Sequence, residues 1–194
     1  MRFYAKELKK KDEILNDEYV EKFINSKRLE GCSRLTIKNY KIHINKMLLY
    51  LNMDVRTIET DDIRKFLSYY LSNNNCYNLT IDGVRRSLFS FFAFLEEEDY
   101  IINNPIRRIH KIKTDILIKE TYTNEFREKL RNSCTTIRVL AIIDLLASSG
   151  IRASELVNLN RDDINFKNKS CIVFGKGKKM REVYFDGKAK LYLK

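Results

Sequence analysis

Two cationic residues of this chain are spaced so that they could act together on a phosphate group. Arg152 stands at the expected start of a short helix, and Lys176 stands 24 positions later in a glycine-rich turn. A guanidinium can bind two phosphate oxygens at once, and a lysine on a turn can give a proton to a leaving alkoxide. Glu155, one helical turn after Arg152, can orient the guanidinium. Taken singly, Arg152 could be a surface arginine paired with Glu155, and Lys176 a solvated hairpin lysine. Their combination indicates phosphodiester chemistry.

A helix and a β-hairpin are expected to position these residues. A long segment that is apolar on most sides predicts a buried helix, and β-branched runs on both sides of a glycine turn predict a hairpin. The expected elements are a helix capped by Thr123, a buried helix over 136–148 ended by Gly150, a short helix over 152–159, and strands over 171–174 and 181–185 joined by the turn at 175–179.

The first half of the chain is expected to be helical. Apolar residues recur there at steps of three and four, which is typical of helices that bury one face. We expect a first helix with Tyr19, Val20, Phe23 and Ile24 inward, and further helices that start near Ser33, Thr60 and Thr80, the last ending before Pro105. The domain prediction is a loose basic arm at 1–13, a helical domain at 14–105, a basic linker at 106–120 and a second domain at 121–194.

Composition narrows the class of partner. The 194 residues contain 44% hydrophobic and 32% charged residues, and the formal net charge is +11. A large polyanion is therefore the expected partner, and nucleic acid is the commonest one. The apolar stretch 139–149 is too short to span a bilayer, and the charged N-terminus is unlike a signal peptide. Cys32, Cys76, Cys134 and Cys171 lie far apart, which favours reduced thiols in a cytoplasmic protein over a zinc site.

A set of spaced motifs resembles the tyrosine recombinase (phage integrase) family. The motifs are Ser-Gly-Ile-Arg-x-Ser-Glu-Leu at 149–156, Asn-Arg-Asp-Asp-Ile at 160–164, Gly-Lys-Gly-x-Lys at 175–179, and Asn-Asn-Pro at 103–105. The resemblance extends from about Asp17 to the end of the chain. It implies a mainly α fold, with a four-helix SAM-like core-binding domain followed by the N-terminal part of an α+β catalytic domain that has a small antiparallel β-sheet.

The resemblance also implies roles for the residues considered above. Arg152 falls on the first catalytic arginine of the family, Glu155 on the acidic residue that supports it, and Lys176 on the β-hairpin lysine. In such enzymes a tyrosine attacks a DNA phosphodiester, forms a 3′-phosphotyrosyl bond and releases a 5′-hydroxyl. The 5′-hydroxyl of another strand then attacks the phosphotyrosyl bond and reseals the DNA. The family uses no metal and no nucleotide cofactor. Its partners are double-stranded DNA and further copies of itself, which form a tetrameric synapse during DNA integration and recombination.

Basic residues on two of the helices and on the hairpin are candidate DNA contacts. They are Arg34, Lys38, Lys41 and Asn45 on the second helix, Arg85 and Arg86 on the fourth, and Lys178, Lys179 and Arg181 around the hairpin. Such stripes bind phosphates or enter a groove in many DNA-binding proteins. The alternative is an ordinary solvated helix face. Asp61-Asp62 and Asp162-Asp163 are better explained as helix and turn caps than as a metal site.

The sequence departs from the family pattern near its C-terminus. It contains no His-x-x-Arg cluster, and Tyr184 and Tyr192 lie too close to the hairpin to be the nucleophile by family position. We therefore expect a C-terminally incomplete recombinase that is inactive alone. The alternatives are a non-cleaving DNA-binding module that occupies sites as a regulator, and an unrelated helical scaffold without affinity for DNA.

Overall fold

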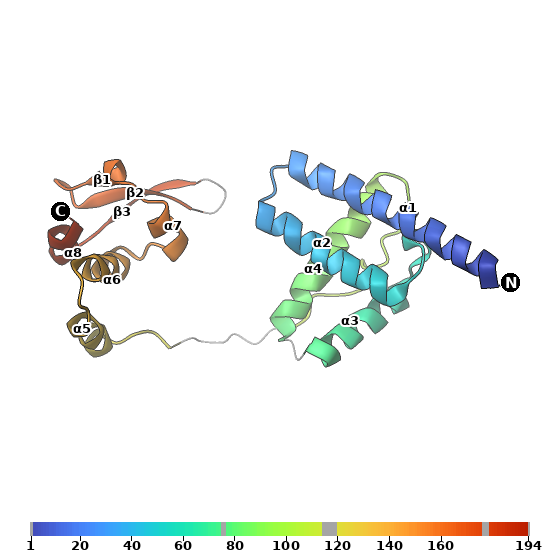
Figure 1. Ribbon diagram of the computed structural model, residues 1–194, viewed down its shortest axis with the longest axis horizontal. Coiled ribbons are helices and arrows are strands. Elements are labelled where there is room, and N and C mark those ends of the chain that lie inside the picture. The colour runs from blue at the N-terminus through green and yellow to red at the C-terminus, as the bar shows by residue number, and fades with distance from the viewer. Residues whose placement is uncertain (1, 75–76, 114–119, 176–178, 194) are drawn as a thin grey trace. The chain divides into compact units, whose positions relative to one another are not determined.

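The computed structural model describes residues 2–74, 77–113, 120–175 and 179–193, with side chains from residue 16 onward and excluding that of Asn74. The chain divides into two compact units, residues 1–117 and 118–194, which we treat separately (Figure 1). None of the described helices combines the length and the apolar character that a membrane span requires.

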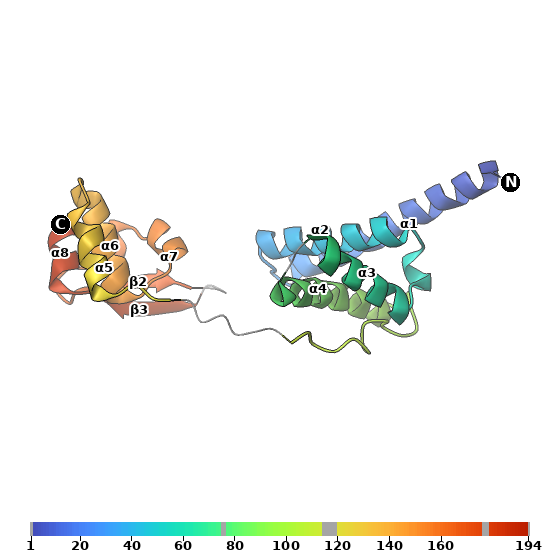
Figure 2. The same ribbon diagram turned by 90° about the horizontal axis from the view of Figure 1, so that it is seen from below.

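Unit 1 begins with two helices that lie side by side. Helix α1 (Arg2–Leu29) and helix α2 (Arg34–Leu51) are joined by a tight turn at Gly31, whose φ of 79° suits glycine (Figures 1 and 2). The Ser33 hydroxyl accepts a hydrogen bond from the Thr36 N–H and so caps α2, as expected. Asn52 in the left-handed region ends the helix.

Two further helices complete unit 1. A 3-10 turn (Val55–Thr57) leads to α3 (Thr60–Asn74), and α4 (Asn78–Glu97) follows. The predicted apolar faces meet in one core, which confirms the inward stripes; its largest fully buried side chains are Phe23, Ile24, Ile44, Met47, Ile63, Phe66, Leu88, Phe91, Phe92, Leu95 and Ile106. The start of the fourth helix differs from the prediction, because α4 begins at Asn78 rather than at Thr80.

The predicted loose arm at 1–13 and the predicted linker at 106–120 are partly ordered. Residues 2–13 form the first turns of α1, because their sequence continues the helix without a Pro or Gly to break it. The beginning of the expected linker is fixed to unit 1, because Ile106 is fully buried and Ile109 and Ile112 pack against the same core. Residues 114–119 of that linker lie outside the described residues.

Within its described residues, unit 2 combines four helices with a small sheet. The elements are α5 (Asn124–Asn132), α6 (Ile137–Ser149), α7 (Ala153–Val157), a 3-10 turn (Arg161–Asp163), β1 (Ile164–Asn165), β2 (Ser170–Phe174), β3 (Met180–Tyr184) and α8 (Gly187–Leu193). The strands are antiparallel in the order β1-β2-β3, with Cys171 opposite Val183 and Val173 opposite Arg181. Thr123 caps α5 and Gly150 ends α6 at a φ of 64°, as predicted, whereas β1 and α8 were not predicted. The predicted fold class, mainly α with a small antiparallel sheet, is confirmed.

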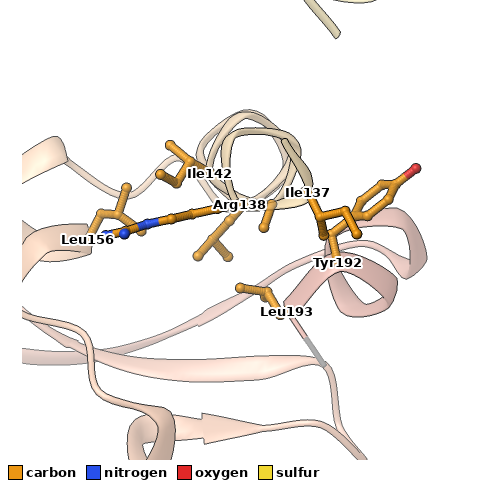
Figure 3. Close-up of a pocket in the computed structure, with 8 residues that line it drawn as sticks. Ile137, Arg138, Ile142, Leu156, Tyr192 and Leu193 are labelled. Atoms are coloured by element: carbon orange, nitrogen blue, oxygen red, sulfur yellow. The ribbon is translucent and has the colours of Figure 1, made fainter. Parts of the chain in front are cut away.

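Helix α6 is less buried than its sequence predicts. Only Ala141, Asp144 and Leu145 are buried, while Ile137 is 67% exposed. The prediction of a buried helix was wrong because α8 and β3 cover α6 on one side, and a hollow of 390 Å³ remains between α6 and α8. Figure 3 shows Arg138 extending across this hollow toward Leu156, and the Tyr192 hydroxyl pointing away from it.

Candidate functional site

The start of α7 holds Arg152 in a defined orientation. Arg152 is the N-cap residue with extended backbone (φ −78°, ψ 152°), and its N–H donates to Glu155 Oε2 at 2.8 Å. Its Nη1 donates to Glu155 Oε1 at 3.0 Å. The Arg152 side chain is nevertheless 66% exposed, whereas that of Glu155 is 2% exposed. The buried carboxylate therefore orients a guanidinium whose remaining N–H groups face solvent.

A second arginine binds the same carboxylate from β3. Arg181 Nη1 donates to Glu155 Oε1 at 2.8 Å, and Arg181 Nη2 donates to Glu155 Oε2 at 2.9 Å. We predicted Arg181 as a DNA contact, but its guanidinium is engaged in this bidentate ion pair. Strand alternation was the missed signal, because Arg181 lies on the same half-buried face of β3 as Val183.

The two arginines keep Glu155 ionised. The Arg152 N–H and the Arg181 guanidinium lower the pKa of Glu155 to about 2. One anion between two cations leaves this cluster with one net positive charge at neutral pH. A phosphate approaching the exposed side of Arg152 would meet that charge.

The neck of the β2–β3 hairpin lies next to this cluster. The Gly175 N–H donates to the Lys179 carbonyl at 2.8 Å, which closes the described end of the hairpin. Lys179 is exposed, as a DNA contact requires. Lys176 and Lys178, the predicted general acid and a predicted DNA contact, lie outside the described residues.

The predicted DNA-contacting cations on α2 differ in whether they form an ion pair. Arg34, Lys38 and Asn45 are exposed, and within the described residues Arg34 and Lys38 have no ion-pair partner. Lys41 instead pairs with Glu21 of α1. Arg34, Lys38 and Lys41 line a surface hollow of 610 Å³ beside the turn that joins α1 and α2. Among the predicted DNA contacts that line the hollow, Arg34 and Lys38 are thus free of ion pairs within the described residues, which suits a phosphate-binding face.

On α4 a buried carboxylate binds both predicted DNA-contacting arginines, which differ in their exposure. Asp82 is 4% exposed and binds Arg85 Nε at 2.9 Å and Arg86 Nε at 3.3 Å. The Arg85 side chain is only 13% exposed, whereas that of Arg86 is 65% exposed. Burial alone would raise the pKa of Asp82, but hydrogen bonds from Arg85 and the Ile112 N–H outweigh it and the pKa is lowered. Arg86 is thus the member of the pair available to a ligand.

Asp82 also fixes the chain that leaves unit 1. It accepts a hydrogen bond from the Ile112 N–H at 3.3 Å, and Asn78 Nδ2 donates to the Lys113 carbonyl at 2.9 Å. The sequence did contain a signal for Asp82, since carboxylates three and four residues before arginines pair with them on a helix.

The other polar groups singled out in the sequence have local partners. Asp62 accepts from the Glu59 N–H and Asp163 from the Asn160 N–H, so both act as caps. His43 Nδ1 lies 2.8 Å from Ser87 Oγ, and burial lowers the pKa of His43. Among the residues described, no three His, Cys, Asp or Glu side chains gather in a way that could hold a metal ion. Cys32, Cys134 and Cys171 are free thiols, and Cys76 lies outside the described residues.

Two family models match consecutive parts of the chain. The model described as phage integrase, N-terminal SAM-like domain, matches residues 19–102, and the phage integrase family model matches residues 118–194. The first match falls in unit 1 and the second in unit 2.

Curated tyrosine recombinases are similar to most of this chain. The chain is 33% identical over 177 residues to tyrosine recombinase XerC of Staphylococcus aureus (strain bovine RF122 / ET3-1), covering 85% of this chain and 58% of that protein. It is 32% identical over 182 residues to XerC of Thermodesulfovibrio yellowstonii, covering 91% of this chain and 60% of that protein. The chain thus spans about three fifths of the length of these relatives.

The fold is shared with solved integrases. A lambda integrase tetramer bound to a Holliday junction has a TM-score of 0.69 at 17% identity, covering 87% of this chain and 50% of that chain. The Tn1549 transposon integrase in complex with circular intermediate DNA has a TM-score of 0.67 at 17% identity, covering 90% of this chain and 62% of that chain.

Proposed function

The chain belongs to the tyrosine recombinase (phage integrase) family, and on that premise we propose that it binds double-stranded DNA and contributes Arg152, Glu155 and Lys176 to a site that cleaves and rejoins a phosphodiester. The observation that supports this most is the Arg152–Glu155 pair. A buried carboxylate holds an arginine that is 66% exposed, so the guanidinium is oriented before any ligand arrives.

The proposed chemistry is an in-line displacement at phosphorus. A tyrosine hydroxyl oxygen attacks the phosphate and its proton passes to solvent water, while the bond from phosphorus to the 5′-oxygen breaks. Negative charge builds on the non-bridging oxygens, where Arg152 stabilises it through two hydrogen bonds. Lys176 gives its proton to the departing 5′-oxygen, and the energy of the broken bond is kept in the phosphotyrosyl ester.

DNA binding is proposed from the distribution of charge. The free cations on α2 and the exposed Arg86 on α4 supply phosphate contacts from unit 1. The structural neighbours include complexes with DNA and a tetramer on a Holliday junction, which supports a DNA partner and self-association on it. We place this activity in the cytoplasm, on the DNA of a mobile element.

We further propose that the 194 residues are a C-terminally incomplete recombinase. No His-x-x-Arg cluster occurs in the sequence, and the chain spans 58% of the first relative. The same facts fit a non-cleaving module that occupies recombination sites. The two proposals differ in whether the gene continues past the codon for Lys194 into a His-x-x-Arg cluster and a tyrosine, so sequencing beyond that codon separates them.

The test of the proposed function begins with a gel shift on duplex DNA at low salt. A mobility shift that weakens as salt rises is expected, and no shift at low salt would exclude DNA binding. In a recombinase that contains this segment together with its tyrosine, Arg152→Ala should slow cleavage by about 10²–10³-fold while DNA affinity stays nearly unchanged. Arg161→Ala is the matched control, because Arg161 is an exposed arginine in the following turn. Equal loss in both variants would refute the role of Arg152.

A sulfur-substituted substrate tests Lys176. Sulfur in place of the bridging 5′-oxygen gives a thiolate leaving group, which needs little protonation. This substrate should rescue Lys176→Ala strongly and Arg152→Ala hardly at all. Equal rescue of both variants, or of neither, would mean that another residue is the general acid.

A further inference from the structure

Arg181 connects two elements that are distant in sequence. It lies on β3, 26 residues after Glu155 on α7, and both of its terminal nitrogens donate to the Glu155 carboxylate. Because that carboxylate is 2% exposed, water does not compete freely for it. The guanidinium fork therefore fixes β3 relative to the start of α7 in distance and in direction.

The hairpin neck lies directly against this ion pair. A Cβ placed on Gly175 would be 3.2 Å from Arg181 Nη1 and 3.5 Å from Glu155 Oε1. The Gly175 N–H at the same place bonds to the Lys179 carbonyl. Gly175 thus allows the last backbone hydrogen bond before the turn to form in contact with both charged groups.

We propose that Arg181 is a positioning residue that fixes the neck of the β2–β3 hairpin to the start of α7, so that Arg152 and Gly175 are held by one rigid connection. Its catalytic meaning rests on the proposed function, because Lys176 follows Gly175 in the sequence. Arg181 itself does not touch the phosphate.

The shared carboxylate gives Arg181 a second effect on Arg152. Glu155 Oε1 accepts from Arg152 Nη1 and from Arg181 Nη1. Without Arg181, Arg152 would be the only cation that the described residues place on this buried carboxylate, which would then draw that guanidinium inward. Arg181 therefore leaves Arg152 free to face a ligand.

Hydrogen exchange in the 194-residue chain tests the connection without DNA. Arg181→Gln should speed exchange of the Gly175 amide by roughly tenfold or more, because a charge-assisted bidentate contact is lost. Arg181→Lys should give an intermediate increase, since an ammonium cannot bind both oxygens in the same plane. Lys179→Gln, an exposed basic residue at the same neck, is the control and should leave exchange unchanged. If Arg181→Gln does not fold, Arg181→Lys decides the test alone.

A spectroscopic readout separates positioning from general stability. The pKa of the Glu155 carboxyl, followed by NMR, should rise in Arg181→Gln and stay low in Lys179→Gln. Gly175→Ala should reproduce part of the faster exchange, because its methyl group meets Arg181 Nη1. Unchanged Gly175 exchange in a folded Arg181→Gln or Arg181→Lys variant would overturn the proposal.

Salt-dependent DNA binding by the same variants distinguishes positioning from phosphate contact. If Arg181 acts only through Glu155 and Arg152, Arg181→Gln made in an Arg152→Ala background should keep the salt slope of the Arg152→Ala chain. A direct phosphate contact would instead lower the slope by about 0.9, and that result would overturn the positioning role. Failure of the parent chain to bind DNA would count against the proposed function alone, because the exchange measurement contains no DNA.

Discussion

The free cations of α2 give the sharpest test of the proposed DNA binding by unit 1. We consider the double substitution of Arg34→Ala with Lys38→Ala. Both side chains are exposed and, as far as the structure is described, neither has an ion-pair partner. The helix should tolerate the change, because alanine favours helix and the buried face of α2 is untouched.

The expected magnitude follows from counting phosphates. Each phosphate neutralised contributes about 0.9 to the slope of log affinity against log salt. Losing two contacts should therefore reduce the slope by about 1.8. Between about 50 and 200 mM salt, a fourfold change, the parent should lose about 12-fold more affinity than the variant.

Affinity measured by fluorescence anisotropy on one duplex across that salt range checks this prediction. The control is Glu21→Gln with Lys41→Gln, which removes the ion pair between α1 and α2 at constant net charge. Because Glu21 already neutralises Lys41, the control should keep the parental slope. An unchanged slope in the Arg34/Lys38 variant, or an equal drop in the control, would refute the assignment of this face.

Three further predictions concern acid stability, the core and covalent chemistry. The pKa of Glu155 is lowered from 4.5 to about 2 on folding, so the stabilisation by its ionised carboxylate is present above pH 4.5 and should be lost as the pH falls from there toward 2. Urea unfolding across this range should show the loss of stability, and the Glu155→Gln variant should show a weaker dependence of stability on pH. Phe91→Ala should destabilise unit 1 by about 3–5 kcal/mol in the same assay, since Phe91 is fully buried against Phe23, whereas Phe89→Ala on the exposed side of α4 should cost far less. On a nicked suicide substrate the 194-residue chain should form no covalent adduct in a denaturing gel, and an adduct that depends on Tyr184 or Tyr192 would contradict this prediction.

Helices and caps were predictable because their signals are local. The core face of α4 follows from apolar residues at three- and four-residue steps, and Ser33, Thr123 and Gly150 mark helix ends through hydrogen bonds within one turn. Where the burial of a helix depends on elements distant in the sequence, the prediction was wrong. Helix α6 has a sequence apolar enough for full burial, yet its exposure is decided by which neighbours cover it.

In the candidate site, too, the local contact was predictable from the sequence and the long-range contact was not. The Arg152–Glu155 pair spans one helical turn, so spacing alone predicts it. The contact between Arg181 and Glu155 spans 26 residues and depends on the register of β2 with β3 and on how α7 meets the sheet. Charge alone made Arg181 resemble the predicted DNA contacts around it. Only its place on the inner face of β3 distinguishes it.

In each unit one buried carboxylate binds two arginines, of which one is less exposed and the other stays largely exposed. Asp82 takes Arg85 into the protein and leaves Arg86 65% exposed, and Glu155 engages Arg181 while Arg152 remains 66% exposed. A carboxylate with a single arginine would neutralise it, whereas one with two leaves a net positive charge at a fixed place. The formal charge of +11 therefore does not tell which cations are free to bind phosphate. It also says nothing of their orientation, which is fixed in each pair because a carboxylate that solvent barely reaches holds the exposed arginine.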